Sequence, residues 1–319
     1  MIIIFASEYA FNKFYNCSFL SNEEWWNEGN PSLLVGIIYL IPGVIFMILY
    51  VPIGLSFLNK KLITLTCYKL MFLLFVLDEI CLSGCSIFSG IMSIQGAVFC
   101  NYPRLMWIFG LLCISIWGSG CCLCVCLGLN RCLDIVNPSI NDMLFNGKKF
   151  YIWMCFIIIY GFYIGVLNSP MFFSSKTYGW FYDPFYGTNI TNLKDPFYYY
   201  NYPHVINNFL VVILLAILYS YFCIKITLKY KLTDKLVISN VQKTLLLQSS
   251  ITCLVQFSAS LFYILIQFIP SSPQFVIFTH LTWIFTHGSP VFIYLIFNKQ
   301  IRKTIFQYFN VFNYNYCKK

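Results

Sequence analysis

Seven long apolar stretches divide this chain of 319 residues and leave little room for anything but membrane helices. The third, Leu105 to Leu129, is 25 residues long and carries no charge. About 20 apolar residues are enough to cross the roughly 30 Å hydrocarbon core of a bilayer as a helix. Backbone polar groups in lipid must be satisfied within each segment, so helices are expected instead of the alternating strands of a membrane barrel. The stretches cover about residues 33–58, 68–97, 105–129, 150–173, 205–228, 245–269 and 275–297. The sequence therefore predicts an all-α membrane protein, a bundle of seven transmembrane helices.

Composition excludes several classes of protein. Hydrophobic residues make up 59% of the chain and charged residues 10%, whereas a soluble domain carries about 25% charged residues. The net charge of +9 does not indicate nucleic acid, because the basic residues are dispersed between apolar stretches. No glycine-rich phosphate loop and no Ser, His and Asp spacing indicates an enzyme, and no pattern asks for a cofactor or metal.

The distribution of basic residues predicts the orientation. With the amino terminus outside, the inner segments hold 16 of the 20 Lys and Arg residues, as the positive-inside rule requires. Both glycosylation sequons, at Asn16 and Asn189, then fall outside. We expect residues 1–32 to be extracellular, residues 33–297 to form the membrane domain, and residues 298–319 to be a cytoplasmic tail at the plasma membrane.

The 15 cysteines favour packing over chemistry, with one exception. Small residues in the third stretch allow close helix packing, and four of them are Cys121, Cys122, Cys124 and Cys126. Only Cys17 and Cys100 fall in segments exposed to an oxidising compartment, so we expect a disulfide between them.

Two acids lie in the middle of the second stretch. A charge at the bilayer centre costs about 2.5 to 3.5 kcal/mol, so such a residue faces the bundle interior. Neighbours on a helix point about 100° apart, and we expect Asp78 to face inward in preference to Glu79. A neutral carboxyl held by hydrogen bonds, with no switching role, is the alternative.

The ends of the third and seventh stretches resemble motifs of rhodopsin-like receptors. Asn130-Arg131-Cys132, followed by Pro138, resembles the Asp-Arg-Tyr pattern, although the adjacent acid and the Tyr are replaced. Ser289-Pro290 with Tyr294 resembles the Asn-Pro-x-x-Tyr motif, with one extra residue, and an amphipathic eighth helix would follow. Asp78 resembles the buried acid of the second helix in these receptors. Its expected polar partners are Ser119, Thr286 and Ser289.

From about Asn16 to Arg302 the chain resembles the nematode serpentine chemoreceptors of class T (Srt), a family of seven-helix receptors. Besides the motifs above, the resemblance rests on Gly36, Tyr39, Gly43, Tyr50, Pro52, Cys67, Tyr68, Lys69, Pro103, Leu144, Phe145, Gly147 and His287. It implies a small-molecule ligand in the outer half of the bundle and a heterotrimeric G protein at the inner face.

The resemblance also implies roles for particular residues. The expected ligand-binding residues are Cys113, Trp117, Gln267 and Trp283. The expected coupling and switch residues are Arg131, Pro138, Pro290, Tyr294 and Tyr221. Basic loop residues such as Lys229, Lys231 and Lys235 would meet the G protein or anionic membrane lipid. The seventh stretch has no Lys, which excludes a retinal Schiff base, and the outer loop of residues 174–203 has no Cys for the usual bridge.

Three other functions are compatible with a seven-helix membrane protein. A ligand-gated channel with its amino terminus inside is opposed by the distribution of basic residues. A seven-helix zinc hydrolase would need His204, His280 and His287 as ligands, and no carboxylate joins them at that depth. An accessory or trafficking protein for another receptor remains open. The aromatic loop of residues 174–203 is expected to be a membrane-interface belt, with direct ligand contact as the alternative.

Overall fold

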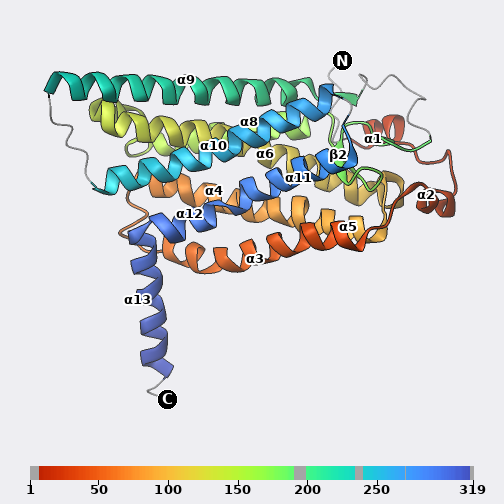
Figure 1. Ribbon diagram of the computed structural model, residues 1–319, viewed down its shortest axis with the longest axis horizontal. Coiled ribbons are helices and arrows are strands. Elements are labelled where there is room, and N and C mark those ends of the chain that lie inside the picture. Colours follow the sequence, from red (N-terminus) through yellow and green to blue (C-terminus); the bar gives the residue numbers. More distant parts are fainter. Residues whose placement is uncertain (1–6, 190–198, 234–239, 270, 317–319) are drawn as a thin grey trace.

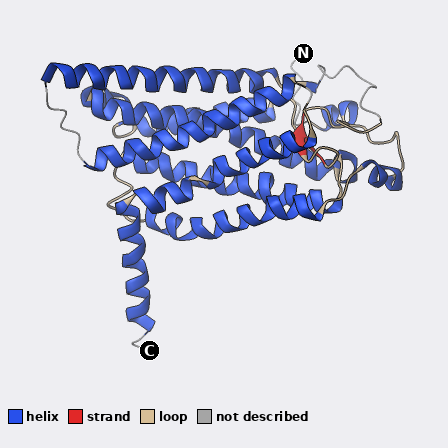
Figure 2. Ribbon diagram, viewed as in Figure 1, coloured by secondary structure: helices blue, strands red, loops and turns tan. Residues whose placement is uncertain are grey.

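A bundle of long helices dominates the computed structural model, which describes residues 7–189, 199–233, 240–269 and 271–316 (Figures 1 and 2). The helices long and apolar enough to cross a membrane number six in the described part of the chain, and a bent pair makes a seventh. The six are α3 (Leu33–Phe57), Thr66–Gln95, α6 (Pro103–Val136), α8 (Lys149–Val166), α9 (Tyr202–Thr233) and α10 (Asn240–Phe268). The predicted seven-helix class of fold is confirmed.

Two of the spans are irregular. The second is built from α4 (Thr66–Leu82), a π-helical turn at Ser83–Phe88 and α5 (Ser89–Gln95). The seventh consists of α11 (Pro273–Gly288) and α12 (Pro290–Phe297), which meet at an angle of 42°. Pro290 has no backbone N–H to continue the hydrogen-bond ladder, so the helix bends at this residue.

The helix α6 is the centre of the bundle and packs against α4, α8, α9 and α10. Its contact with α8 is very close, because small residues face each other there. A Cβ atom added to Gly165 would lie 1.9 Å from Ser115 Oγ, and one added to Gly161 would lie 1.9 Å from Ser119 Oγ. These positions admit only glycine at the observed helix separation.

The fourth span ends earlier than predicted. The sequence predicted helix up to about Phe173, whereas α8 ends at Val166. Pro170 follows a few residues later, and proline disfavours the helical conformation before it. The chain then forms a hairpin of β1 (Phe172–Ser174) and β2 (Gly179–Phe181), in which Phe173 pairs with Trp180.

This hairpin corrects the expectation of a membrane-interface belt for part of the loop only, since Tyr202 of the same aromatic run is 57% exposed. Phe173 and Trp180 are fully buried against the bundle, and the indole Nε1 of Trp180 donates to Ser89 Oγ at 2.9 Å. Tyr199 is also buried, and its hydroxyl donates to the carbonyl oxygen of Phe14. Phe173, Trp180 and Tyr199 are therefore buried inside one end of the bundle.

The amino-terminal segment covers the same end. It contains the short helices α1 (Glu8–Phe14) and α2 (Asn22–Glu28). The 3₁₀ turn η2 (Phe99–Asn101), which precedes α6, lies at this end too. Cys17 and Cys100 are joined in a disulfide with Cα atoms 5.6 Å apart. Tyr15 is buried beside Phe172, with ring centroids 4.9 Å apart. We call this the disulfide end of the bundle.

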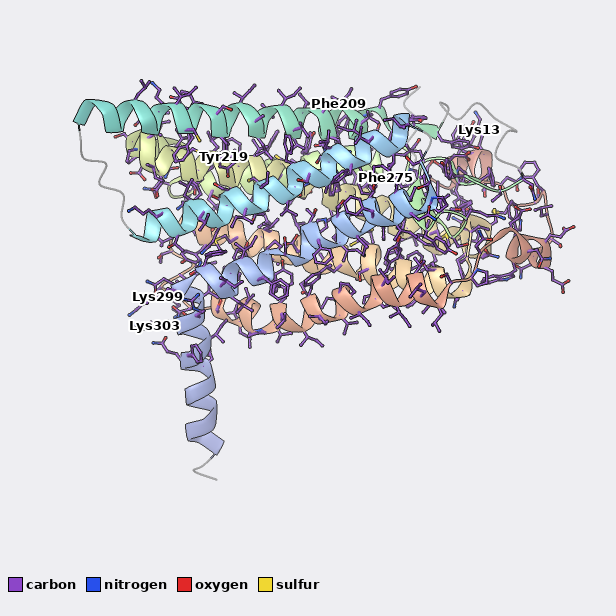
Figure 3. The ribbon with its side chains drawn as sticks, in the orientation of Figure 1. Lys13, Phe209, Tyr219, Phe275, Lys299 and Lys303 are labelled. Atoms are coloured by element: carbon purple, nitrogen blue, oxygen red, sulfur yellow. A yellow bond between two sulfur atoms is a disulfide. The ribbon has the colours of Figure 1, made fainter. Side chains whose placement is uncertain are left out.

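The opposite end carries α7 (Pro138–Phe145) and α13 (Lys299–Tyr316). Figure 1 shows α13 leaving the bundle steeply, and in Figure 3 Lys299 and Lys303 lie at its start, far from Lys13. Asn298 sits at the junction, where its Oδ1 accepts from the backbone N–H groups of Gln300 and Ile301. We call this the α13 end.

Candidate functional site

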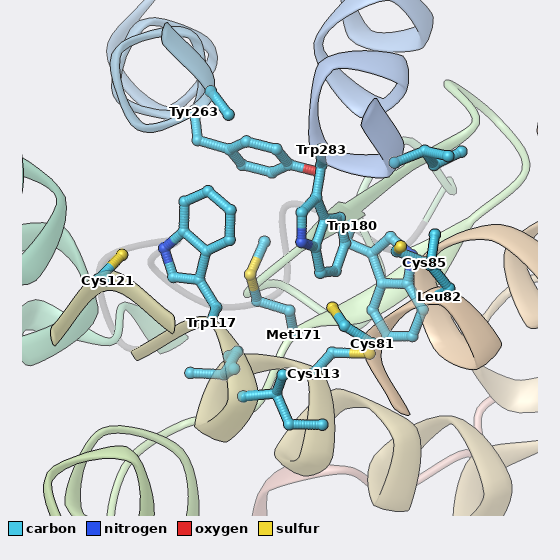
Figure 4. Close-up of a cluster of buried hydrophobic side chains, with 14 of the residues drawn as sticks. Cys81, Leu82, Cys85, Cys113, Trp117, Cys121, Met171, Trp180, Tyr263 and Trp283 are labelled. Carbon is cyan, nitrogen blue, oxygen red and sulfur yellow. The ribbon is translucent and has the colours of Figure 1, made fainter. Parts of the chain in front are cut away.

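A small cavity lies inside the bundle at the disulfide end, next to the buried hairpin. Its volume is about 250 Å³ including the gaps between side chains, and the free space at its centre holds about one water molecule. Side chains from α6, α9, α10 and α11 meet here (Figure 4). The lining residues are Cys113, Ile114, Trp117, Met171, His204, Tyr263 and Trp283.

The structure brings together three of the four residues expected to bind ligand. Cys113, Trp117 and Trp283 line this one cavity. Gln267 lies near the end of α10, and its side chain is outside the described residues. Whether the three bind a ligand stays a prediction.

Sequence reasoning missed four lining residues. Tyr263 lies one helical turn before Gln267 and could have been found from that spacing. Met171 follows the end of α8 and reaches the cavity only because the chain turns into the hairpin. His204 was considered only as a metal ligand, and Ile114 gave no signal beyond its neighbour Cys113.

Aromatic rings pack edge to face around Trp283. The ring centroid of Trp283 lies 6.2 Å from that of Trp117, at an interplanar angle of 90°, and 5.6 Å from that of Tyr263. Trp180 of the hairpin lies 6.2 Å away. Such arrangements place the positive edge of one ring against the negative face of another. Helices α6, α10 and α11 and the hairpin thus meet at one aromatic cluster.

A chain of hydrogen bonds leads from the cavity to the outer face of the bundle. Trp117 Nε1 donates to Asn208 Oδ1 at 2.7 Å, and Asn207 Nδ2 donates to the same oxygen at 3.2 Å. The Tyr160 hydroxyl donates to Asn207 Oδ1 at 2.9 Å. Tyr160 and Asn207 line a second cavity, with about 270 Å³ of free space, between α6, α8 and α9.

A polar cluster lies near the middle of the bundle around Asp78, which is buried as predicted from its depth in the span. Its Oδ2 accepts from the Tyr50 hydroxyl at 2.8 Å, and its Oδ1 lies 2.8 Å from His287 Nδ1. The Tyr50 hydroxyl is also 2.9 Å from the backbone oxygen of His287. The cluster joins α3, α4 and α11.

The residues expected to pair with Asp78 lie elsewhere. Ser119 donates to the carbonyl oxygen of Ile157 in α8, because it sits on the face of α6 that contacts α8. Thr286 donates within its own helix to the carbonyl oxygen of Thr282, and Ser289 Oγ has no hydrogen-bond partner among the described residues. Tyr50 and His287 were both in the sequence, but the spacing of a motif could not show that their longer side chains reach the acid.

At the α13 end Arg131 is buried and 7% exposed. Its guanidinium group donates to Asn130 Oδ1 from two nitrogens, and its Nη1 lies 3.6 Å from Asp134 Oδ2. Asn130 Nδ2 donates onward to Asn141 of α7 at 2.9 Å. Asn130 stands where rhodopsin-like receptors have an acid next to the arginine, and Asp134, one helical turn further along, supplies the acidic partner of Arg131 instead.

The other expected switch residues are spread over the same end. Pro138 is the first residue of α7, and Pro290 is the first residue after the bend. Tyr294 is buried, and no hydrogen-bond partner is found for its hydroxyl in the described part of the chain. Tyr221 is 48% exposed on the outer face of α9, whereas the hydroxyl of Tyr219 is buried toward α6. The structure does not bring Tyr221 to Arg131.

Both sequons lie at the disulfide end. Asn16 is exposed, and its Oδ1 accepts from the backbone N–H of Ser18. Asn189 is exposed as well, and its Nδ2 donates to Glu28 Oε1 at 2.6 Å.

The three histidines lie in separate places. His280 Nε2 is 2.7 Å from the carbonyl oxygen of Cys85, His204 pairs with the Tyr182 hydroxyl, and His287 pairs with Asp78. Within the described residues, no three His, Cys, Asp or Glu side chains are placed to hold a metal ion.

The fold, the bent seventh span and the buried arginine define a rhodopsin-like seven-helix receptor. The crystal structure of squid rhodopsin is similar, with a TM-score of 0.68, 12% identity, and coverage of 93% of this chain and 91% of that one. The profile of the family "Serpentine type 7TM GPCR chemoreceptor Srt" matches residues 1–317, so the chain belongs to this family. It is 25% identical over 291 residues to serpentine receptor class T-55 of Caenorhabditis elegans, covering 91% of this chain and 78% of that protein. The family is not enzymatic.

Proposed function

We propose that this receptor binds a small molecule in the central cavity and activates a heterotrimeric G protein at its α13 end. The observation that carries the proposal is the cavity itself, where Cys113, Trp117 and Trp283 converge from two helices. Ligand sites are concave, mostly apolar and formed where helices of a bundle meet. A ligand here would contact α6, α10 and α11 together.

The route from cavity to G protein runs through the polar cluster. Trp283 lies one turn before His287 on α11, and His287 pairs with Asp78 two residues before the bend begins at Ser289. A ligand that shifts α11 would act on this pair and on the bend at Pro290. Ligand can bias the two conformations only by its differential affinity for them, so contacts to the moving helix are required.

The α13 end has the features of a coupling surface. Arg131 is held by Asn130 and Asp134 in a closed arrangement, and release of this arginine would free a buried cation for a partner. We propose that α13 and the basic residues near it face the cytoplasm and anionic lipid, and that the disulfide end is extracellular at the plasma membrane. Support comes from the sequons and the disulfide, which share one end, and from the basic residues, which gather at the other.

The test is G-protein activation in cells that express the receptor, measured without ligand and across a panel of odorants. Arg131→Ala should abolish the signal while surface biotinylation stays unchanged. Arg104→Ala is the matched control, because Arg104 is an exposed arginine at the disulfide end, paired with Glu8. A signal that survives Arg131→Ala would contradict the role of this residue. A receptor that reaches the surface and binds odorants but never activates a G protein would favour an accessory protein.

A further inference from the structure

One hydrogen-bond donor in the aromatic cluster has no acceptor among the residues that the structure describes. The side chain of Trp283 is 5% exposed, and its indole Nε1 finds no partner in the described part of the chain. Its two tryptophan neighbours are satisfied, since Trp117 donates to Asn208 and Trp180 donates to Ser89. A buried N–H without an acceptor is unfavourable, so its retention calls for an explanation.

The unpaired donor faces the cavity. Trp283 is one of the cavity-lining residues, and Figure 4 shows its indole nitrogen on the side of the ring toward Trp117 and Met171. An acceptor placed in the cavity would therefore come within reach of this N–H group.

The lining also limits the charge and size of the occupant. Among the residues that the structure describes, no Lys, Arg, Asp or Glu lines the cavity, so an ionised ligand would lose its hydration without gaining a counter-ion. The free space holds about one water molecule, so a larger ligand must displace side chains. Met171 is the most adaptable of these, because its unbranched side chain has three rotatable bonds.

We propose that the cavity takes a compact, neutral, apolar molecule with one acceptor oxygen, such as a short-chain ketone, aldehyde or ester, and that Trp283 Nε1–H donates to that oxygen. This inference rests on the proposed ligand site and adds the chemical class of the ligand. The rest of the molecule would pack against Ile114, Tyr263 and the ring of Trp117. Amines and carboxylates of the same length would be rejected.

The experiment measures binding to the purified full-length receptor without any G protein. Thermal unfolding is followed with titrated ketones of four to eight carbons, the alkanes of equal length, and the matching alkylamines and carboxylates. Ketones should raise the unfolding midpoint at concentrations roughly tenfold lower than alkanes, because only they accept the hydrogen bond. Equal binding of ketones and alkanes, or no binding of any ketone, would overturn the proposal.

Two variants assign the effect to Trp283. Trp283→Phe removes the N–H group and keeps a ring, so the preference for ketone over alkane should disappear. Trp180→Phe is the matched control, because Trp180 packs against Trp283 outside the cavity lining and its N–H is already bonded to Ser89, so the preference should persist. If Trp283→Phe still preferred ketone over alkane, the indole N–H would not donate to the ligand and would instead point at a neighbouring aromatic ring.

A second measurement uses the unaltered chain in case Trp283→Phe does not fold. With ¹⁵N-labelled indoles, one of the seven tryptophan N–H signals should shift strongly with ketone and little with alkane. Identical shifts with both would overturn the proposal. If the receptor shows this shift with ketone but never activates a G protein, the proposed ligand chemistry would be supported and the proposed G-protein coupling would be contradicted.

Discussion

The imidazole Nδ1 of His287 lies 2.8 Å from the carboxylate Oδ1 of Asp78, and both side chains are at least 98% buried. The pair joins α4 to α11 in the interior of the bundle, and Tyr50 of α3 completes it. The bend between α11 and α12 begins two residues after His287. The seventh span is therefore fastened just before its bend by Tyr50 and Asp78, and α12 packs against α3 and α10 beyond the bend.

This pair predicts non-additive mutational effects. Asp78→Asn and His287→Leu should each lower the thermal stability of the purified receptor, because each leaves a buried polar partner unsatisfied. The double variant should lose less than the sum, with a coupling energy of about 1 to 3 kcal/mol. Thr286→Val is the control, because in the described part of the chain that hydroxyl bonds within its own helix, to Thr282. Additive losses would show that the two groups do not stabilise each other.

The close contact of α6 and α8 gives a second prediction. Gly165→Ala would place a Cβ 1.9 Å from Ser115 Oγ, and Gly161→Ala would place one 2.4 Å from the Ser115 backbone oxygen. The helices must separate, and we expect a loss of about 1 to 3 kcal/mol from each change. Gly120→Ala is the control in α6, because nothing lies within 4 Å of its added Cβ. Unfolding midpoints in detergent compare the three, and equal midpoints would contradict the close packing.

The hydrophobicity of the sequence predicted where the membrane helices lie, but not where every helix ends. Spans appear as apolar stretches, and all seven began within five residues of the predicted position. The helix end at Val166 and the hairpin after it were missed, because Phe172 and Phe173 continue the apolar pattern while the backbone changes from helix to strand. Apolar composition alone cannot distinguish a lipid-facing aromatic residue from a buried one.

The candidate site was less predictable. Its depth in the second span was enough to place Asp78 in the interior of the bundle. The positions of Cys113, Trp117 and Trp283 along their helices placed them at the same depth in the membrane. The partners of Asp78 could not be found in the same way, because contacts between helices depend on the rotation and tilt of each helix. His287 of α11 contacts Asp78 of α4, whereas Ser119 of α6 faces α8.

The Cys17–Cys100 disulfide gives a third prediction. It fastens the amino-terminal segment to the turn before α6, across a sequence separation of 83 residues. Cys17→Ser and Cys100→Ser should each reduce stability by about 2 to 5 kcal/mol and lower surface delivery, and the double variant should match the singles. Cys155→Ser, an exposed free cysteine of α8, is the control. Surface biotinylation and unfolding midpoints measure both effects, and a double variant much worse than either single would mean that the cysteines act separately.

The last prediction concerns Asp183, in the segment that follows β2. Its side chain is 9% exposed, and its Oδ1 accepts from the backbone N–H of Phe185 at 3.0 Å. Burial disfavours the charged carboxylate and raises the pKa of Asp183 from 3.8 to about 6, although the bond from Phe185 opposes this. The folded segment therefore binds the proton more tightly than the unfolded chain does.

The sign of the pH effect follows from that difference. The protonated carboxyl stabilises the folded segment fully below about pH 4, and this contribution is lost as the pH rises through about 6. At pH values above that range, the free energy of unfolding of the segment is about 3 kcal/mol lower than it is with the protonated carboxyl. Asp183→Asn keeps an acceptor for Phe185 and stays neutral, so it should match the wild type at pH 4 and protect the hairpin better at pH 7.4. Hydrogen exchange of residues 172–189, corrected for intrinsic rates, measures this, with Asp142→Asn in α7 as the control. Equal protection of Asp183→Asn and wild type at pH 7.4 would show that the carboxylate is hydrated in the folded receptor.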